Sequence, residues 1–311
     1  MITGKYKFQI KFNEDALLPM YKGSTFRGVF GHALKKSVCA LKFQNCENCI
    51  LNSNCLYPFV FEKKLNKSTK NISADPHPIV IVPPQTKQKE FVKGDILETE
   101  VILFGQANEK LPYFILTFQN MGEMGIGKKI KGRRSSFQLK KVSSGGNIIF
   151  EGESNTFSDN ITSQYLELNS CKHSSECSEI KINYNTPLRI NFDKKIPKDL
   201  TFQDLTRIML RRISSLMNAY GDGEPELNYK RLIEQAEQIK IKNSDLFWQD
   251  MKRYSNRQRK EMYMGGLLGE ITYCGNLSEY IPLIDACSKI HIGKNTMFGL
   301  GCYDYQLGGS C

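Results

Sequence analysis

Four cysteines gather in one short part of the sequence. Cys39, Cys46, Cys49 and Cys55 all fall in residues 39–55, whereas the rest of the ten cysteines are scattered. Compact spacing of this kind is typical of a tetrahedral thiolate site, and both zinc and an iron–sulfur cluster accept four thiolates. The alternative is a loop of four reduced cysteines without a metal. We expect one structural metal, with zinc preferred to an iron–sulfur cluster.

His32 is the residue whose type and position best fit proton transfer. It falls in a predicted helix over residues 24–41, in which apolar residues recur at helical spacing and define one buried stripe. That stripe consists of Phe26, Val29, Phe30, Ala33, Leu34 and Val38. At about 100° per residue, His32 lies on the opposite face beside Gly28, Lys35 and Lys36. Because histidine titrates near neutral pH, His32 is a candidate general acid or base, and an ordinary surface histidine is the alternative.

Two glycines interrupt the same predicted helix. Glycine inside a helix costs about 0.8–1 kcal/mol relative to alanine, yet Gly28 and Gly31 both occur there. The compensation that we expect is a close approach of another backbone or of a ligand.

A strongly basic run covers residues 125–141. It holds seven cations and no acid, and its three glycines leave room for a backbone to lie against phosphate. Each neutralised phosphate releases counterions and adds affinity, so the run predicts polyanion binding. A merely solvated ribbon is disfavoured because the repulsion among the cations is uncompensated. A second basic cluster, residues 252–260, precedes the pair Gly265–Gly266.

A glycine-rich loop lies just before the last predicted strand. Backbone N–H groups at its glycines can approach phosphate, and neighbouring polar side chains add donors. These residues are Gly293, Lys294, Asn295, Gly299 and Gly301. The loop is neither a nucleoside-triphosphate P-loop nor a dinucleotide fingerprint, because a strand follows it and no helix opens from it. His291, at the start of the loop, competes with His32 as a catalytic candidate.

Composition narrows the class of protein. Lys and Arg number 43 against 32 Asp and Glu, and the net charge of +11 indicates a polyanion partner or a solvated basic surface. With 40% hydrophobic residues the chain can form cores, and it has no apolar run long enough to cross a membrane. The alternating N-terminus predicts a strand rather than a signal peptide, so we expect a cytoplasmic protein. The sequence shows no strong carboxylate pair of the kind that metal-dependent nucleases use.

The predicted elements form two halves with the same order, strand–helix–strand–strand–helix–strand, with one extra helix in the second half. The first half has strands at 5–12, 79–82, 91–104 and 136–142, and helices at 24–41 and 111–120. The second has strands at 179–192, 246–254, 263–274 and 298–307, and helices at 202–219, 229–239 and 278–288. This order predicts an α+β protein with two tandem ferredoxin-like (RRM-like) domains. We expect an N-terminal domain at 1–152 with a Cys-rich insertion at 39–62, a linker at 153–178 and a C-terminal domain at 179–311.

Several motifs occur together over nearly the whole chain. They are Leu18–Lys35, Cys55–Glu62, Met124–Lys129, Gly265–Gly269 with Gly275, and His291–Gly301. In this combination the sequence resembles the CRISPR precursor-RNA processing endoribonucleases, the sixth Cas family of the RAMP superfamily. The resemblance implies two tandem ferredoxin-like domains and metal-independent cleavage within the CRISPR repeat. The 2′-hydroxyl would attack the adjacent phosphorus, leaving a 2′,3′-cyclic phosphate and a 5′-hydroxyl.

The resemblance also implies roles for single residues. His32 matches the histidine that members commonly carry on the first helix, and Tyr21, Lys35 and Lys36 are its candidate partners. The RNA-binding residues would be Arg27, Lys128, Lys129, Lys131, Arg133, Arg134, Gly293, Lys294, Asn295, Gly299 and Gly301. Catalysis would need no cofactor.

The implied partners are CRISPR repeat RNA, its crRNA product and other Cas proteins of an effector complex. The protein would act as a monomer or homodimer and away from membranes. Two alternatives stay open. One is a non-catalytic RAMP subunit that binds CRISPR RNA within an effector complex, and the other is a general single-stranded RNA-binding module.

Overall fold

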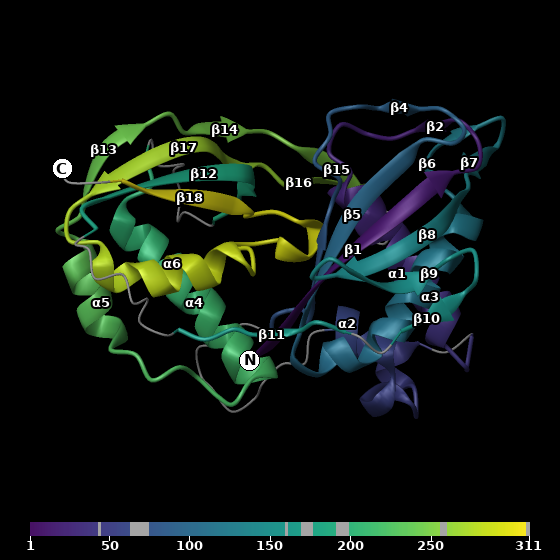
Figure 1. The fold of residues 1–311 in the computed structure, drawn as a ribbon, viewed down its shortest axis with the longest axis horizontal. Helices are drawn as coiled ribbons and strands as arrows, with labels where there is room; N and C mark the ends of the chain where they lie inside the picture. Colours follow the sequence, from purple (N-terminus) through teal and green to yellow (C-terminus); the bar gives the residue numbers. More distant parts are fainter. Residues whose placement is uncertain are drawn as a thin grey trace. The chain divides into compact units, whose positions relative to one another are not determined.

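The computed structural model describes residues 1–42, 45–62, 75–158, 161–168, 177–190, 199–255 and 260–308. Its contacts divide the chain into two units. Unit 1 comprises Met1–Tyr165 with Ala219–Gly221, and unit 2 comprises Leu166–Asn218 with Asp222–Cys311. Each unit is built on an antiparallel sheet with helices packed against it (Figure 1). No helix among the described residues is long and apolar enough to pass through a membrane.

The sheet of unit 1 has the strand order β10-β9-β8-β1-β5-β3, with β11 also paired to β1. Its strands are β1 (Ile2–Phe12), β3 (Ile79–Val82), β5 (Ile96–Phe104), β8 (Phe137–Ser144), β9 (Asn147–Glu151), β10 (Thr156–Phe157) and β11 (Gln164–Tyr165). β1 lies at the centre, where its alternate residues face opposite sides of the sheet. Phe8 and Ile10 are therefore fully buried, whereas Lys7 and Lys11 are exposed.

The helices of unit 1 cover one face of this sheet (Figure 1). They are α1 (Gly23–Val38), α2 (Leu56–Phe61) and α3 (Leu111–Met124), with 3₁₀ turns η1 (Cys46–Asn48), η2 (Asn52–Asn54) and η3 (Gly105–Lys110). Phe30 of α1 contacts Phe114 and Phe118 of α3, and Phe8 stacks on Phe118 at 4.2 Å between ring centres. The order β1–α1–β3–β5–α3–β8 is the one predicted for the first half.

Two short pairs flank the sheet of unit 1. They are β2 (Ala16–Leu17) with β4 (Glu90–Phe91), and β6 (Ile126–Ile130) with β7 (Arg133–Ser135). The segment predicted as a linker, 153–178, contains β10 and β11, and the contacts divide the units at Tyr165. Residues 159–160 and 169–176 of that segment lie outside the described residues.

The sheet of unit 2 has the order β13-β17-β12-β18, with β14 paired to β17. Its strands are β12 (Glu179–Leu188), β13 (Lys240–Ser244), β14 (Phe247–Gln249), β17 (Gly266–Cys274) and β18 (Tyr303–Gly308), and β15 (Lys252–Ser255) pairs separately with β16 (Lys260–Tyr263). Its helices are α4 (Phe202–Tyr220), α5 (Tyr229–Ala236) and α6 (Ile281–Ser288), with 3₁₀ turns η4 (Ser278–Tyr280) and η5 (Thr296–Phe298). The core includes edge-to-face packing of Phe202 against Tyr273 and Tyr280.

Two strand predictions in unit 2 are wrong in position. The strand predicted at 246–254 is replaced by β13, which ends at Ser244, and by the short β14 and β15. β13 is a mostly exposed edge strand, so its residues carry little apolar alternation for the sequence to show. The last strand begins at Tyr303 rather than at 298, because Thr296–Phe298 form a buried 3₁₀ turn.

Candidate active site and RNA-binding surfaces

Helix α1 begins beside a buried lysine that the sequence pattern did not mark. Lys22 is 0% exposed, and its ammonium donates hydrogen bonds to the carbonyl oxygens of Met20 (3.2 Å) and Thr86 (2.8 Å). The ammonium also lies 5.9 Å from the centre of the Phe91 ring. Burial lowers the pKa of Lys22, because the charged form loses hydration. These contacts fix the chain where α1 starts.

The exposed side of α1 carries His32. Phe26, Phe30 and Leu34 of the same helix are 0% exposed, so His32 does lie opposite the buried stripe. Within the described residues, its imidazole has no hydrogen-bond or ion-pair partner. A substrate that approached this face of α1 could therefore contact the ring directly.

The two glycines of α1 have different surroundings. A Cβ added at Gly31 would lie 3.2 Å from the Phe61 ring of α2, so the group that approaches closely is an aromatic side chain and not the backbone or ligand that was expected. A Cβ added at Gly28 would meet nothing within 4 Å. Since Gly28 is one helical turn from His32, the surface beside the histidine is open.

The other three predicted catalytic residues are held in different places. The Lys35 ammonium lies 5.4 Å from the centre of the Tyr57 ring, on the side of the cysteines. The Lys36 ammonium forms an ion pair with Glu123 of α3 at 3.6 Å. Tyr21 is half-buried in the loop that leads into α1. The structure therefore places both lysines on the helix of His32, with their ammonium groups engaged by neighbouring elements.

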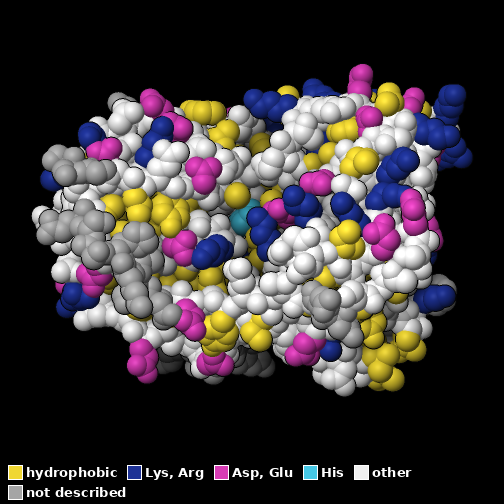
Figure 2. Space-filling model, in the orientation of Figure 1, with side chains coloured by type: hydrophobic (Ala, Val, Ile, Leu, Met, Phe, Trp, Pro, Cys, Tyr) yellow, Lys and Arg dark blue, Asp and Glu magenta, His cyan; other side chains and the backbone are white. Residues whose placement is uncertain are grey.

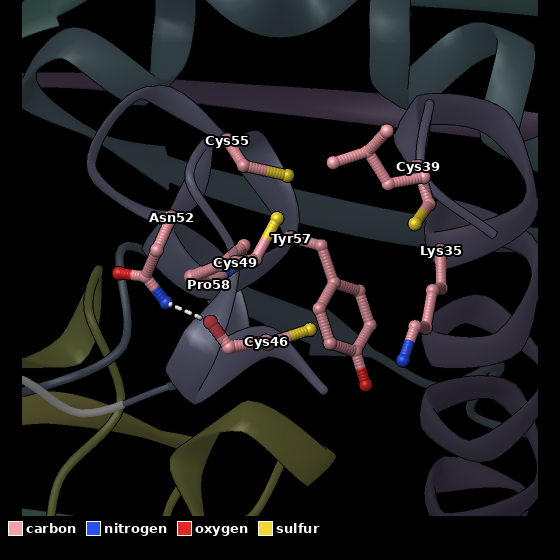
Figure 3. A pocket seen from close by; sticks show the side chains of 9 residues that line it. Lys35, Cys39, Cys46, Cys49, Asn52, Cys55, Tyr57 and Pro58 are labelled. Atoms are coloured by element: carbon pink, nitrogen blue, oxygen red, sulfur yellow. Dashed lines mark hydrogen bonds between the residues drawn. The ribbon is translucent and has the colours of Figure 1, made fainter. Parts of the chain in front are cut away.

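The four clustered cysteines line one pocket, together with Lys35 and Tyr57 (Figure 3). All four are half-buried free thiols. Burial raises the pKa of Cys46, and Glu62 adds to this effect while the Lys35 charge opposes it. As the side chains stand, no three cysteine, histidine or carboxylate groups among the described residues are close enough to hold a metal ion. The metal site therefore stays a prediction.

Residues 126–135 of the basic run form the ribbon β6–β7, whose exposed turn is Lys131–Gly132, and the end of the run enters β8. Lys and Arg side chains gather at this end of the molecule (Figure 2). Arg133 forms an ion pair with Glu14 at 3.0 Å, and Arg134 donates a hydrogen bond to the Gly127 carbonyl oxygen at 2.6 Å. No ion pair engages the three lysines among the described residues. These are Lys128, Lys129 and Lys131.

The glycine-rich loop of unit 2 directs most of its backbone donors inward. The N–H group of Lys294 donates to Arg189, that of Gly299 to Thr296 and that of Gly301 to Pro187. Gly293 and Gly301 have positive φ angles of 80° and 73°, and a Cβ on either would collide with backbone oxygens. Packing and backbone geometry therefore explain these glycines, and Lys294 and Asn295 are exposed.

His291 is buried rather than presented to solvent. It is 2% exposed, and its Nδ1 lies 3.1 Å from the Leu300 carbonyl oxygen. Its own carbonyl oxygen and that of Ile290 each accept a hydrogen bond of 2.9 Å from Arg212 of α4. His291 therefore belongs to the architecture of the loop. Arg212 was missed in the sequence, although a cation inside the apolar stripe of α4 is a signal that could have found it.

Two arginines lie over aromatic rings. The guanidinium carbon of Arg27, a predicted RNA contact, is 4.7 Å from the centre of the Phe61 ring. That of Arg253, in the second basic cluster, is 4.6 Å from the centre of the Phe298 ring in the glycine-rich loop. Arg253 thus brings a cation to this loop. Arg257 and Arg259 of the same cluster lie outside the described residues.

Comparisons with known proteins match both halves of the chain. Residues 1–162 match the family model AF_1859_N, described as an N-terminal domain, and residues 182–303 match the model for the CRISPR-associated endoribonuclease Cas6. An uncharacterized protein of Archaeoglobus fulgidus is 30% identical over 294 residues, which cover 92% of this chain and 92% of that protein.

Solved Cas6 structures share the fold across both units. A Cas6 product complex superposes with a TM-score of 0.56 at 12% identity, covering 98% of this chain and 99% of that one. Thermus thermophilus Cas6 gives 0.51 at 11% identity, covering 98% of each chain. A chain of a partial Cas6-RT-Cas1–Cas2 complex gives 0.60 at 14% identity, covering 99% of this chain but only 46% of that longer one. The chain therefore belongs to the family of the AF_1859_N model and of this archaeal protein, and its residues 182–303 carry the domain of the CRISPR-associated endoribonuclease Cas6.

Proposed function

We propose that this protein cuts precursor CRISPR RNA within the repeat by metal-independent transesterification, with His32 transferring the proton. The observation that carries the proposal is the exposed imidazole on α1, which has no partner among the described residues, in a chain whose residues 182–303 match the Cas6 model. The open surface at Gly28 beside it gives an RNA strand room to approach. The strand orders of both sheets support reading each unit as a ferredoxin-like sandwich.

The chemistry needs a proton acceptor, a proton donor and positive charge. The ribose 2′-hydroxyl attacks the adjacent phosphorus, and the bond from phosphorus to the 5′-oxygen breaks. His32 removes the proton of the 2′-hydroxyl or protonates the leaving 5′-oxygen. Lys35 and Lys36 stand on the same helix and supply positive charge for the phosphorane. Tyr21 is the remaining candidate for the second proton-transfer group.

The RNA backbone is proposed to contact two basic surfaces. The first is the ribbon β6–β7, with its unpaired lysines and Arg133, and the second is the exposed pair Lys294 and Asn295. Arg27 is the additional contact expected on α1. Lysine contacts to phosphates hold the RNA backbone without reading bases. Assembly with other Cas proteins, as in the solved complex with RT, Cas1 and Cas2, is part of the proposal.

The test is cleavage of CRISPR repeat RNA by the full chain in EDTA. We expect cleavage by the wild type, products that carry a 2′,3′-cyclic phosphate, and no cleavage when the scissile ribose is 2′-deoxy. His32→Ala should slow cleavage by about 10²–10⁴-fold and leave RNA affinity nearly unchanged. Cleavage that requires added Mg²⁺ would refute the mechanism. RNA binding without any cleavage would instead show a non-catalytic RNA-binding subunit.

A further inference from the structure

Residues 45–55 of the insertion bury almost no apolar side chain, whereas α2 at its end buries Pro58 and Val60. Neither η1 nor η2 contains a buried residue. Ile50 is 84% exposed and Leu51 is 43% exposed. A segment that buries so little apolar surface gains little from the hydrophobic effect, so its order must come from another interaction.

The backbone of the insertion instead brings three cysteines to one side. The N–H group of Cys49 donates to Cys46 at 3.2 Å, and that of Cys55 donates to Asn52 at 3.4 Å. The Asn52 side-chain amide also donates to the Cys46 carbonyl oxygen at 2.7 Å (Figure 3). The two 3₁₀ turns have the same backbone hydrogen bond, and each is followed by a cysteine that lines the pocket.

The fourth cysteine lies at the C-terminal end of α1. Cys39 directly follows Val38, the last residue of this helix, and its N–H group donates to the Lys35 carbonyl oxygen at 3.0 Å. In Figure 3 its sulfur faces those of Cys46, Cys49 and Cys55 across the pocket. The pocket therefore lies between the end of α1 and the insertion.

We propose that Cys39, Cys46, Cys49 and Cys55 bind one zinc ion that ties the insertion to the C-terminal end of α1. Four thiols around one pocket are the donor set of a closed structural zinc site. With zinc–sulfur bonds of about 2.3 Å, tetrahedral geometry sets the sulfur atoms about 3.8 Å apart, so binding draws the side chains inward. Each thiol releases its proton on binding.

The position of Lys35 favours a zinc ion in this pocket. Zn²⁺ with four thiolates carries a net charge of −2, and the ammonium of Lys35 lines the same pocket. An adjacent cation offsets part of that charge in a half-buried place. The metal acts here as a structural tie and takes no part in RNA cleavage.

The experiment measures metal in the purified full chain. We expect one zinc per chain by elemental analysis, slow alkylation of the four thiols, and fast alkylation after a strong chelator has removed the zinc. Cys49→Ser and Cys55→Ser should each lose the zinc, whereas Cys274→Ser, a half-buried cysteine on β17, should keep it.

A second measurement avoids variants that fail to fold. Co²⁺ added to metal-stripped wild-type protein should give the visible absorption and thiolate charge-transfer bands of a tetrahedral four-sulfur site. Absence of zinc together with four freely alkylated thiols would overturn the proposal. Zinc retained by both serine variants, or iron with acid-labile sulfide in its place, would overturn it as well. None of these readouts involves RNA, so they stand apart from the test of cleavage.

Discussion

Replacing Gly28 by alanine should stabilise unit 1. Gly28 lies inside α1, and the added Cβ meets nothing within 4 Å, so the substitution creates no clash. Alanine is favoured over glycine in a helix interior by about 0.8–1 kcal/mol, and we expect the free energy of unfolding to rise by this amount. For a unit of this size, the gain corresponds to a rise of about 2–4 °C in Tm.

Gly31→Ala is the matched control in the same helix. It gains the same helix propensity, but its Cβ lies 3.2 Å from the Phe61 ring, so α2 must shift. We therefore expect a smaller stabilisation than for Gly28→Ala, or a loss. Chemical denaturation of both variants under identical conditions measures the difference.

The same two variants probe where the RNA lies. If RNA approaches α1 beside His32, the methyl group of Gly28→Ala stands in its path, and repeat cleavage should slow although the protein is more stable. Gly31→Ala faces the Phe61 ring, so any loss of cleavage there should follow its loss of stability. A Gly28→Ala protein that is no more stable than the wild type refutes the reasoning about open space. A Gly28→Ala protein that is more stable and cleaves at the wild-type rate would show that the RNA does not approach this face of α1.

Three further outcomes are expected. Replacing Lys128, Lys129 and Arg133 together by alanine should weaken RNA binding and reduce the slope of log K against log salt by about 0.7–0.9 per lost phosphate contact, measured by salt titration. Arg212→Met should destabilise unit 2 by about 1–3 kcal/mol, because two buried carbonyl oxygens lose their donors, whereas its exposed neighbour Arg211→Met should change little in the same denaturation assay. Hydrogen bonds from Ser136, together with the Arg133 charge, hold the pKa of Glu14 below its ordinary value of 4.5. The ionised Glu14 should therefore stabilise unit 1 above pH 4.5, and this stabilisation should be lost as the pH falls through the lowered pKa. Glu14→Gln should remove this loss from the pH dependence of unfolding.

The helical period was enough to predict α1, its buried stripe and the outward position of His32. It could not show that Lys36 pairs with Glu123, since that carboxylate comes from α3, far along the chain. Nor could it identify Lys22 as buried, because only folding brings the carbonyl oxygen of Thr86, far along the chain, next to its ammonium together with that of Met20.

The glycine-rich loop shows a different limit of sequence reasoning. Its glycines suggested donors for phosphate, but the same residue type is needed wherever positive φ or a close backbone contact occurs. At Gly293 and Gly301 the packing against neighbouring backbone explains the glycine. The strand that became β13 was predicted at the wrong position, because an exposed edge strand shows no alternation of apolar and polar residues.

The central place of β1 has a consequence for biosynthesis. β1 ends at Phe12 and is made well before its two neighbours, β5 and β8, which end at Phe104 and Ser144. At roughly 5–20 residues per second, the ribosome needs on the order of ten seconds from the end of β1 to the end of β8. Until β8 has been made, the sheet around β1 is incomplete, and the apolar face that includes Phe8 and Ile10 cannot be fully buried. Nascent chains arrested before β8 should therefore bind chaperones or aggregate, and chains arrested beyond unit 1 should resist protease.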